Sequence, residues 1–190
     1  DGAPRARSPR STSPTLVCTG ILEPRKNQTF IVDVCSHLWR SGLHFELHLV
    51  GRVNPHFGEP VLRRVREVER EFPGRVHHHE GVSDEKLAEL LSSARATVFP
   101  TRAEGCGLPL LESLWRGVPC VCSDLPVLRE NADGGGCVAV PQDDTEAWEN
   151  VLRRILLEDG FHAELVRSAH ARPLPSWLDS AGALRAGLGA

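Results

Sequence analysis

The most constraining feature of this sequence is a strand–turn–helix unit at residues 96–119. The apolar run Ala96 to Pro100 predicts a buried strand, and Glu104-Gly105-Cys106-Gly107 predicts a turn. Pro109 suits the start of a helix, where its missing N–H costs nothing, and Gly117-Val118-Pro119 predicts the end of that helix. A glycine turn that leads into a helix N-terminus gathers free amides and the positive end of the helix dipole, which favours an anion.

Two carboxylates flank the predicted turn: Glu104 lies within it, and Glu112 follows one turn into the helix. Backbone amides suit phosphate, whereas carboxylates suit sugar hydroxyls, and a nucleotide-sugar contains both. Glu112 has a simpler interpretation as a helix-surface acid paired with Arg116 four residues on. We expect Leu108, Leu111 and Trp115 to form the apolar face of this helix.

Strand and helix patterns alternate along the rest of the chain with short connections. Strands are expected at 15–20, 45–50, 75–79, 96–100, 118–123 and 137–140, and helices after Asn27, at 61–71, from Ser83 or Asp84, after Gly107, near 126–131, at 144–157 and 161–171, and from Trp177. This alternation predicts an α/β fold with a parallel sheet of about six strands and helices on both faces.

In such a fold the ligand lies beyond the carboxyl ends of the strands. The loops at 20–27, 51–58, 80–84 and 101–108 all follow strands, so we expect them to surround one crevice. The candidate residues that these loops contribute are Gly20, Lys26, Arg52, Val82 and Glu104.

Arg25 and Lys26 precede the N-terminus of the first expected helix, for which Asn27 is a good N-cap. A diphosphate would gain from both cations, since arginine offers a bidentate fork and lysine a compact charge. The alternative is a solvated basic pair beside Glu23.

Composition bounds the function classes further. The chain has 190 residues, enough for one α/β domain at 15–190 after a polar linker or tail at 1–14. Its formal net charge of −3 argues against nucleic acid as a partner. No apolar run approaches the roughly 20 residues that span a bilayer. The missing initiator methionine suggests a fragment.

We expect the six cysteines to be reduced and mostly buried, as in a cytoplasmic protein, with Cys106 as a candidate surface thiol.

Three consecutive histidines, residues 77–79, are a candidate metal site. On a strand, however, His77 and His79 point to one face and His78 to the other. No cysteine or carboxylate completes a ligand set nearby, and the adjoining Glu80 has no recognisable spacing. We therefore expect no metal.

The sequence of the turn and its helix, residues 104–112, closely resembles the E-G-F-G-L-P-x-x-E signature of group 1 retaining glycosyltransferases. Residues 23–27 (EPRKN) resemble a variant of that family's phosphate-binding loop. The resemblance covers roughly residues 15–160 and includes Gly81 to Asp84, Gly117 to Pro119 and Ser123 to Glu130. It implies a GT-B architecture of two Rossmann-like domains, of which this chain is the C-terminal, donor-binding half.

The resemblance also assigns roles to the candidate residues. It implies that Lys26 and Arg25 hold the donor diphosphate, Glu104 contacts the donor sugar, and Glu112 binds ribose hydroxyls. Amides of the turn would approach sugar and phosphate, and backbone near Val82 would lie close to the base. The residues that supply those amides are Gly105, Cys106, Gly107 and Leu108.

Two positions depart from the family pattern. Cys106 replaces the usual aromatic residue, which changes the expected shape of the sugar pocket, and Ile21 stands where the family has a second phosphate-binding arginine. Arg25 is expected to compensate.

The resemblance implies transfer of a sugar from a nucleotide-diphosphate donor with retention of configuration, without a cofactor or divalent metal. The acceptor, a glycan or lipid-linked molecule in polysaccharide assembly, would bind the missing N-terminal domain. We therefore expect this fragment to bind nucleotide but to be inactive alone. The resemblance implies a cytoplasmic enzyme, with or without peripheral attachment to the membrane. It implies no particular oligomeric state.

Two alternatives remain at this point. One is another enzyme on the same scaffold, a nucleotide-sugar epimerase or a sugar phosphorylase, although neither an extra acid–base group nor a cofactor lysine is evident. The other is a non-catalytic Rossmann-like module that binds a nucleotide or a partner protein, in which Glu104 would have no purpose.

Overall fold

The computed structural model describes residues 13–189 of the chain. The expected tail at 1–14 therefore lies outside the described residues, except for its last two. Pro14 already continues the sheet, since its carbonyl accepts a 2.9 Å hydrogen bond from the amide of Glu46.

The described residues alternate between strands and helices, as predicted. The strands are β1 (Thr15–Thr19), β2 (Glu46–Val50), β3 (Val76–His79), β4 (Ala96–Phe99), β5 (Cys120–Ser123) and β6 (Cys137–Val140). The helices are α1 (Gln28–Arg40), α2 (Glu59–Glu71), α3 (Asp84–Ser93), α4 (Leu108–Trp115), α5 (Pro126–Ala132), α6 (Thr145–Leu157), α7 (Asp159–Ala171) and α8 (Trp177–Gly187), with a 3-10 turn η1 (Pro24–Lys26) before α1.

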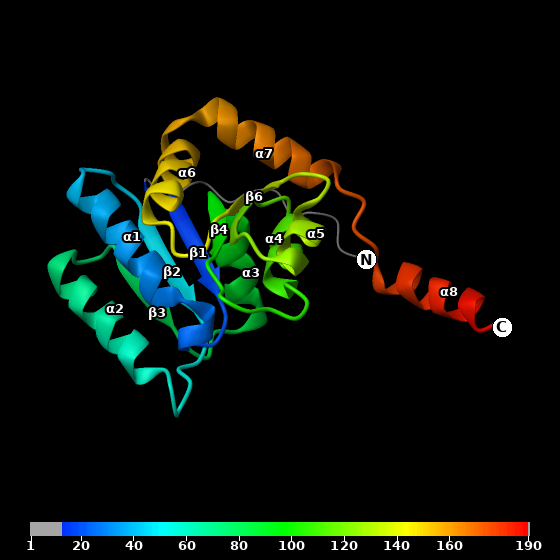
Figure 1. Ribbon diagram of the computed structural model, residues 1–190, viewed down its shortest axis with the longest axis horizontal. Helices are drawn as coiled ribbons and strands as arrows, with labels where there is room; N and C mark the ends of the chain where they lie inside the picture. The colour runs from blue at the N-terminus through cyan, green and yellow to red at the C-terminus, as the bar shows by residue number, and fades with distance from the viewer. Residues whose placement is uncertain (1–12, 190) are drawn as a thin grey trace.

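The six strands form one parallel sheet in the order β3-β2-β1-β4-β5-β6, which confirms the predicted α/β class (Figure 1). This is the Rossmann order, in which the chain reverses its direction of travel across the sheet between β1 and β4. The carboxyl ends of these two strands therefore mark the place where a ligand binds in folds of this kind.

Helices cover both faces of the sheet (Figure 1). Side chains of α1, α2 and α6 pack on one face around Phe45 and Trp148, both fully buried. On the other face, α3 packs against β1 through Leu90 and Leu91, while α4 and α5 pack against β4 and β5. None of the helices in the described part of the chain has the length and apolar composition to cross a membrane.

The cysteines follow the sequence prediction. All six are free thiols, and Cys106 is exposed at the turn before α4. The buried ones are Cys18, Cys35, Cys120 and Cys122, while Cys137 is partly buried.

Two local predictions are only partly correct. The face of α4 that packs on the sheet carries Leu110 and Leu114, with Leu111 partly buried against them, whereas Leu108 and Trp115 are 58% and 60% exposed. Asn27 occupies the N-cap position of α1 as predicted, but its backbone is left-handed with φ 58° and its side chain makes no capping hydrogen bond. Its side-chain amide instead donates to Asp143, 3.0 Å away.

Glycines directly follow β1 and β2, and the second of them has no room for a side chain. The amide of Gly20 donates to Val50, and that of Gly51 donates to His79, each at 2.9 Å. A Cβ on Gly51 would lie only 2.1 Å from the carbonyl oxygen of Gly20. Any side chain at position 51 would therefore separate these two strand ends and displace the loop that follows β1.

Candidate functional site

Lys26 and Glu104 form an ion pair at the carboxyl ends of the two central strands. Lys26 follows β1, Glu104 follows β4, and Nζ lies 2.6 Å from Oε2. Both side chains are largely buried, 11% and 14% exposed. The structure thus brings together two predicted site residues that are 78 positions apart in the sequence.

The backbone around Lys26 and Glu104 is held by hydrogen bonds between their two loops. The carbonyl of Arg25 accepts from the amide of Arg102 at 2.8 Å and from the hydroxyl of Thr101 at 3.2 Å. The stem of Lys26 runs alongside Gly20, and its ammonium lies 5.1 Å from the centre of the Phe99 ring. A Cβ at position 20 would lie 3.7 Å from this stem, which is an ordinary contact distance.

Glu104 is ionised at neutral pH. Burial raises its pKa, but the hydrogen bond and charge of Lys26, the amide of Gly105 and the charge of Arg25 lower it, so that the pKa lies below its usual value. An ionised carboxylate only accepts hydrogen bonds, which suits contact with hydroxyl groups.

Arg25 lies at the same site but is held less tightly. One guanidinium nitrogen is 3.9 Å from Glu104 and donates to the carbonyl of Ala103 at 3.0 Å, while the other lies 2.7 Å from Glu23. The side chain is 47% exposed, so it retains a face open to an incoming anion.

The glycine turn leads directly into α4. Gly107 precedes the helix with φ 75°, a conformation that favours glycine, and a Cβ there would lie 2.7 Å from Leu128. Asn131 braces the turn by donating to the carbonyl of Cys106 at 2.6 Å. Pro109 has no N–H and the amide of Leu110 donates back to the carbonyl of Gly107 at 3.0 Å, so Leu108 is the residue of the first turn whose amide needs a partner from outside the helix.

The other predicted residues lie on the expected elements without touching the ion pair. Glu112 is exposed in the second turn of α4 and, within residues 13–189, forms no ion pair with Arg116. Arg52 is exposed after β2, and Val82 packs partly on the cluster under α3. Their convergence on one ligand stays a prediction.

Sequence reasoning missed a second network beside the ion pair. Asp143, in the loop after β6, accepts hydrogen bonds at 3.0 Å from both Asn27 and Arg102. The hydrogen bonds from Arg102 and Asn27 and the charge of Arg102 lower the pKa of Asp143 despite its partial burial. The side-chain amide of Gln142 donates hydrogen bonds to the carbonyls of Thr101 and Arg102, so a third loop supports the loop of Glu104. No local sequence motif predicts this contact between the loop after β6 and the loops of Asn27 and Arg102.

The histidines of β3 also have neighbours that the sequence did not reveal. His77 and His79 share a face of the sheet, as predicted, but Glu46 and His48 of β2 lie beside them. The expectation that no carboxylate completes a ligand set is therefore wrong, because Glu46 Oε2 is 3.1 Å from His77 Nε2. This group of side chains lies on the face of the sheet that also carries α3.

We expect the histidine cluster to make the fold sensitive to mild acid. Burial and the nearby His77 and His79 lower the pKa of His48 to about 4, although Glu46 opposes this. Burial, together with His77, Lys86 of α3 and His78, also lowers the pKa of His79. Each folded-state pKa lies below the unfolded value near 6.5, so the unfolded chain binds more protons as the pH falls.

The contribution of these two histidines to the free energy of unfolding is therefore fully present above about pH 6.5 and is lost toward pH 4. The loss is at most about 1.4 kcal/mol per pH unit for each proton taken up on unfolding. Urea unfolding at several pH values measures this slope. His48→Gln should flatten it, whereas His56→Gln, at an exposed loop histidine, should not. An unchanged slope in His48→Gln would contradict the assignment of this pH dependence to the lowered pKa of His48.

Comparison with known proteins identifies the family. Residues 13–158 match the family described as "Glycosyl transferases group 1". The chain is 36% identical over 138 residues to the O-antigen chain mannosyltransferase B of Escherichia coli, covering 72% of this chain and 35% of that protein. It is 30% identical over 132 residues to the serotype-specific mannosyltransferase WbdA of E. coli, covering 70% of this chain and 16% of that protein.

Solved structures agree on the fold. Sucrose-phosphate synthase from Thermosynechococcus elongatus superposes with a TM-score of 0.78 at 24% identity, over 94% of this chain and 46% of that one. Anabaena HepE, in complex with UDP and glucose, superposes with a TM-score of 0.74 at 17% identity, over 84% and 43%. The chain thus spans about a sixth to a third of these curated relatives and just under half of these structures, and it has the fold of one half of a GT-B glycosyltransferase. It belongs to the group 1 glycosyltransferase family.

Proposed function

We propose that this chain is the donor-binding half of a glycosyltransferase and holds a nucleotide-diphosphate sugar at the carboxyl ends of β1 and β4. The observation that carries the proposal is the ion pair between Lys26 and Glu104, at the switch point of the sheet and beside the N-terminus of α4. A cation, helix amides and an ionised carboxylate within one small region match a ligand with a diphosphate next to hydroxyl groups.

Each residue has a distinct part in the proposed complex. Lys26 and Arg25 bind the diphosphate, and Glu104 accepts hydrogen bonds from the donor sugar once Lys26 has turned to phosphate. Glu112 binds the ribose, and backbone near Val82 lies against the base. The turn amides contribute to both groups, while Gly20 and Arg52 shape the remaining wall. The turn consists of Gly105, Cys106, Gly107 and Leu108.

The chemistry expected of this half is electrostatic. Cleavage of the bond between sugar and diphosphate leaves negative charge on the phosphate oxygens, which cations and amides already in place stabilise. We propose that transfer retains the anomeric configuration and needs no divalent metal at this site.

The names of the relatives favour a mannosyl donor and an acceptor in polysaccharide assembly. The acceptor, a glycan or lipid-linked molecule, would bind a second GT-B domain that lies outside this sequence. We therefore propose that the chain alone binds nucleotide but turns over little or no sugar. We place the enzyme in the cytoplasm, with the lipid-linked class of acceptor at the membrane surface.

The first test is thermal unfolding of the chain with millimolar UDP, GDP, dTDP and ADP. A nucleotide present at 100 times its dissociation constant should stabilise the chain by about 2.7 kcal/mol. For a chain of this size that corresponds to a rise in Tm of roughly 5–10 °C. We expect one base to be preferred and Glu112→Ala to abolish most of the shift, because the ribose loses its carboxylate.

Glu164→Ala is the matched control, since Glu164 is an exposed acid on α7, away from the strand ends. A shift that survives in Glu112→Ala would remove the ribose assignment. The absence of any shift with all four nucleotides would favour the alternative of a non-catalytic module.

A further inference from the structure

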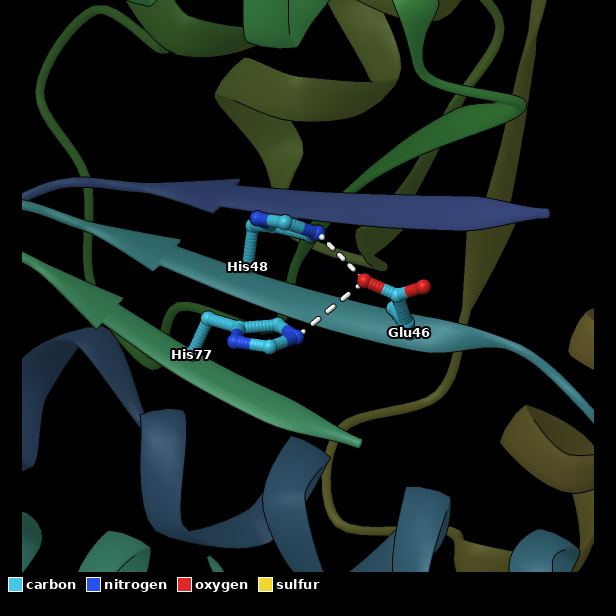
Figure 2. Close-up of side chains that lie close together, drawn as sticks. All are labelled: Glu46, His48 and His77. Atoms are coloured by element: carbon cyan, nitrogen blue, oxygen red, sulfur yellow. Dashed lines mark hydrogen bonds and ion pairs between the residues drawn. The ribbon is translucent and has the colours of Figure 1, made fainter. Parts of the chain in front are cut away.

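Three metal-binding side chains converge on one face of the sheet, at a distance from the donor site. Glu46 and His48 lie two residues apart on β2 and therefore point to the same face. His77 of β3 is the direct neighbour of His48 in the parallel register. Figure 2 shows the rings of His48 and His77 turned toward the same carboxylate oxygen of Glu46. We propose that Glu46, His48 and His77 bind a Zn²⁺ ion.

The separations of the ligand atoms fit a single ion. Glu46 Oε2 lies 3.4 Å from His48 Nε2 and 3.1 Å from His77 Nε2, and one ligand atom from each residue lies within 4.8 Å of the others. Ligands of a tetrahedral zinc ion, with bonds of about 2.0–2.2 Å, lie roughly 3.3–3.5 Å apart. The separation from His48 already has the required length and the one from His77 is slightly short, so side-chain rotation must adjust that separation and the third.

The two ring nitrogens of His48 have the surroundings that a metal ligand needs. Its Nε2 is buried and meets Glu46 Oε2 at 3.4 Å as an ion-pair partner, but among the described residues it makes no hydrogen bond. Its other ring nitrogen, Nδ1, lies 2.9 Å from Nε2 of His79, whose ring is nearly parallel to it with centres 5.1 Å apart. When Nδ1 donates its proton to His79, Nε2 carries a lone pair directed at the Glu46 carboxylate. A cation between them satisfies both groups, and the ring nitrogen of His79 takes the place of the carboxylate, carbonyl or water that usually orients a metal-bound histidine.

The donor set selects the kind of metal. Two imidazoles and a carboxylate suit zinc and neighbouring transition metals, whereas Mg²⁺ and Ca²⁺ prefer oxygen ligands alone. Three protein ligands leave a fourth position for water. His77 and Glu46 are 33% and 27% exposed, so an ion can enter from solvent.

The proposed site is separate from the donor site and does not depend on it. Glu46 pairs with Thr15 at the start of β1, whereas Lys26 lies beyond the end of that strand. Five residues of strand at about 3.3 Å each separate the two ends. Because β3 is the edge strand of the sheet, the ion would join this edge to β2 and stabilise it.

Calorimetric titration of ZnCl₂ into the metal-free chain, without an affinity tag, tests the proposal. We expect one zinc per chain and a rise in Tm when the site is filled, with no binding of Mg²⁺. Cobalt in place of zinc should give the visible absorption of a low-symmetry nitrogen and oxygen site. His77→Gln should lower zinc affinity at least tenfold, and Glu46→Gln should do the same.

His56→Gln, which removes an exposed histidine outside the cluster, should bind zinc like the parent. Since His77 is partly exposed, its replacement should leave the fold intact, which circular dichroism verifies. The proposal is overturned if the parent binds no zinc. It is also overturned if folded His77→Gln and Glu46→Gln bind it as tightly as His56→Gln does.

Discussion

Replacing Lys26 with methionine is expected to weaken nucleoside diphosphate binding by about 10- to 100-fold, as loss of a hydrogen bond to a charged group does. Methionine keeps an apolar stem alongside Gly20 and Phe99, so the change chiefly removes the ammonium. Binding of the corresponding nucleoside, which has no phosphate, should change little. Titration calorimetry with both ligands separates the loss of a phosphate contact from damage to the rest of the site.

The only other lysine of the chain provides the control. Lys86 lies on α3 and pairs with Glu89 on the helix surface, so Lys86→Met should bind nucleotides like the parent. Arg25→Ala should cause a smaller loss than Lys26→Met, because that guanidinium is more exposed and already shared with Glu23. Equal losses for the diphosphate and the nucleoside would show that Lys26 acts on the structure of the loop rather than on phosphate.

Gly51→Ala is expected to destabilise the fold by about 3 kcal/mol and to abolish most nucleotide binding. The added Cβ would lie 2.1 Å from the Gly20 carbonyl oxygen and 2.6 Å from its carbon. These are backbone atoms and cannot rotate away, so β1 and β2 must part at their carboxyl ends. That movement displaces the loop carrying Lys26. Urea unfolding and nucleotide titration measure the two effects.

Gly160→Ala is the matched control, because a Cβ at this exposed position of α7 meets nothing within 4 Å. Alanine there should change stability by less than about 1 kcal/mol. If Gly51→Ala were as mild, the close approach of the two strand ends would not position the site.

The sequence predicted the sheet well because its signals are local. Each strand is a short apolar run between turn residues, and all six lie within two residues of their expected bounds. Which face of α4 is buried was not predictable in this way. Leu108 and Trp115 are as apolar as Leu110 and Leu114, and only the direction from which the sheet meets the helix distinguishes them.

The candidate site was predictable where topology alone sets the contact. Lys26 and Glu104 follow adjacent central strands, so strand order brings them together despite their separation in sequence. The contact of Asp143 with Asn27 depends instead on left-handed backbone at both residues, which no local pattern indicates. The pairing of His77 with Glu46 required the register between β2 and β3, which apolar patterns do not define in strands rich in histidine.

The ion pair between Lys26 and Glu104 has a consequence for which molecules can enter. Each of the two charges satisfies the other, at 2.6 Å and largely away from water. A free monosaccharide would have to compete with an ammonium for the carboxylate, and it brings nothing to replace the lost attraction. Under the proposed function, a diphosphate would bring its own charge for the lysine and would so release the acid. The diphosphate and the sugar of a donor would then each favour binding of the other. Neither the nucleoside diphosphate alone nor the sugar alone would compete strongly with the intact donor.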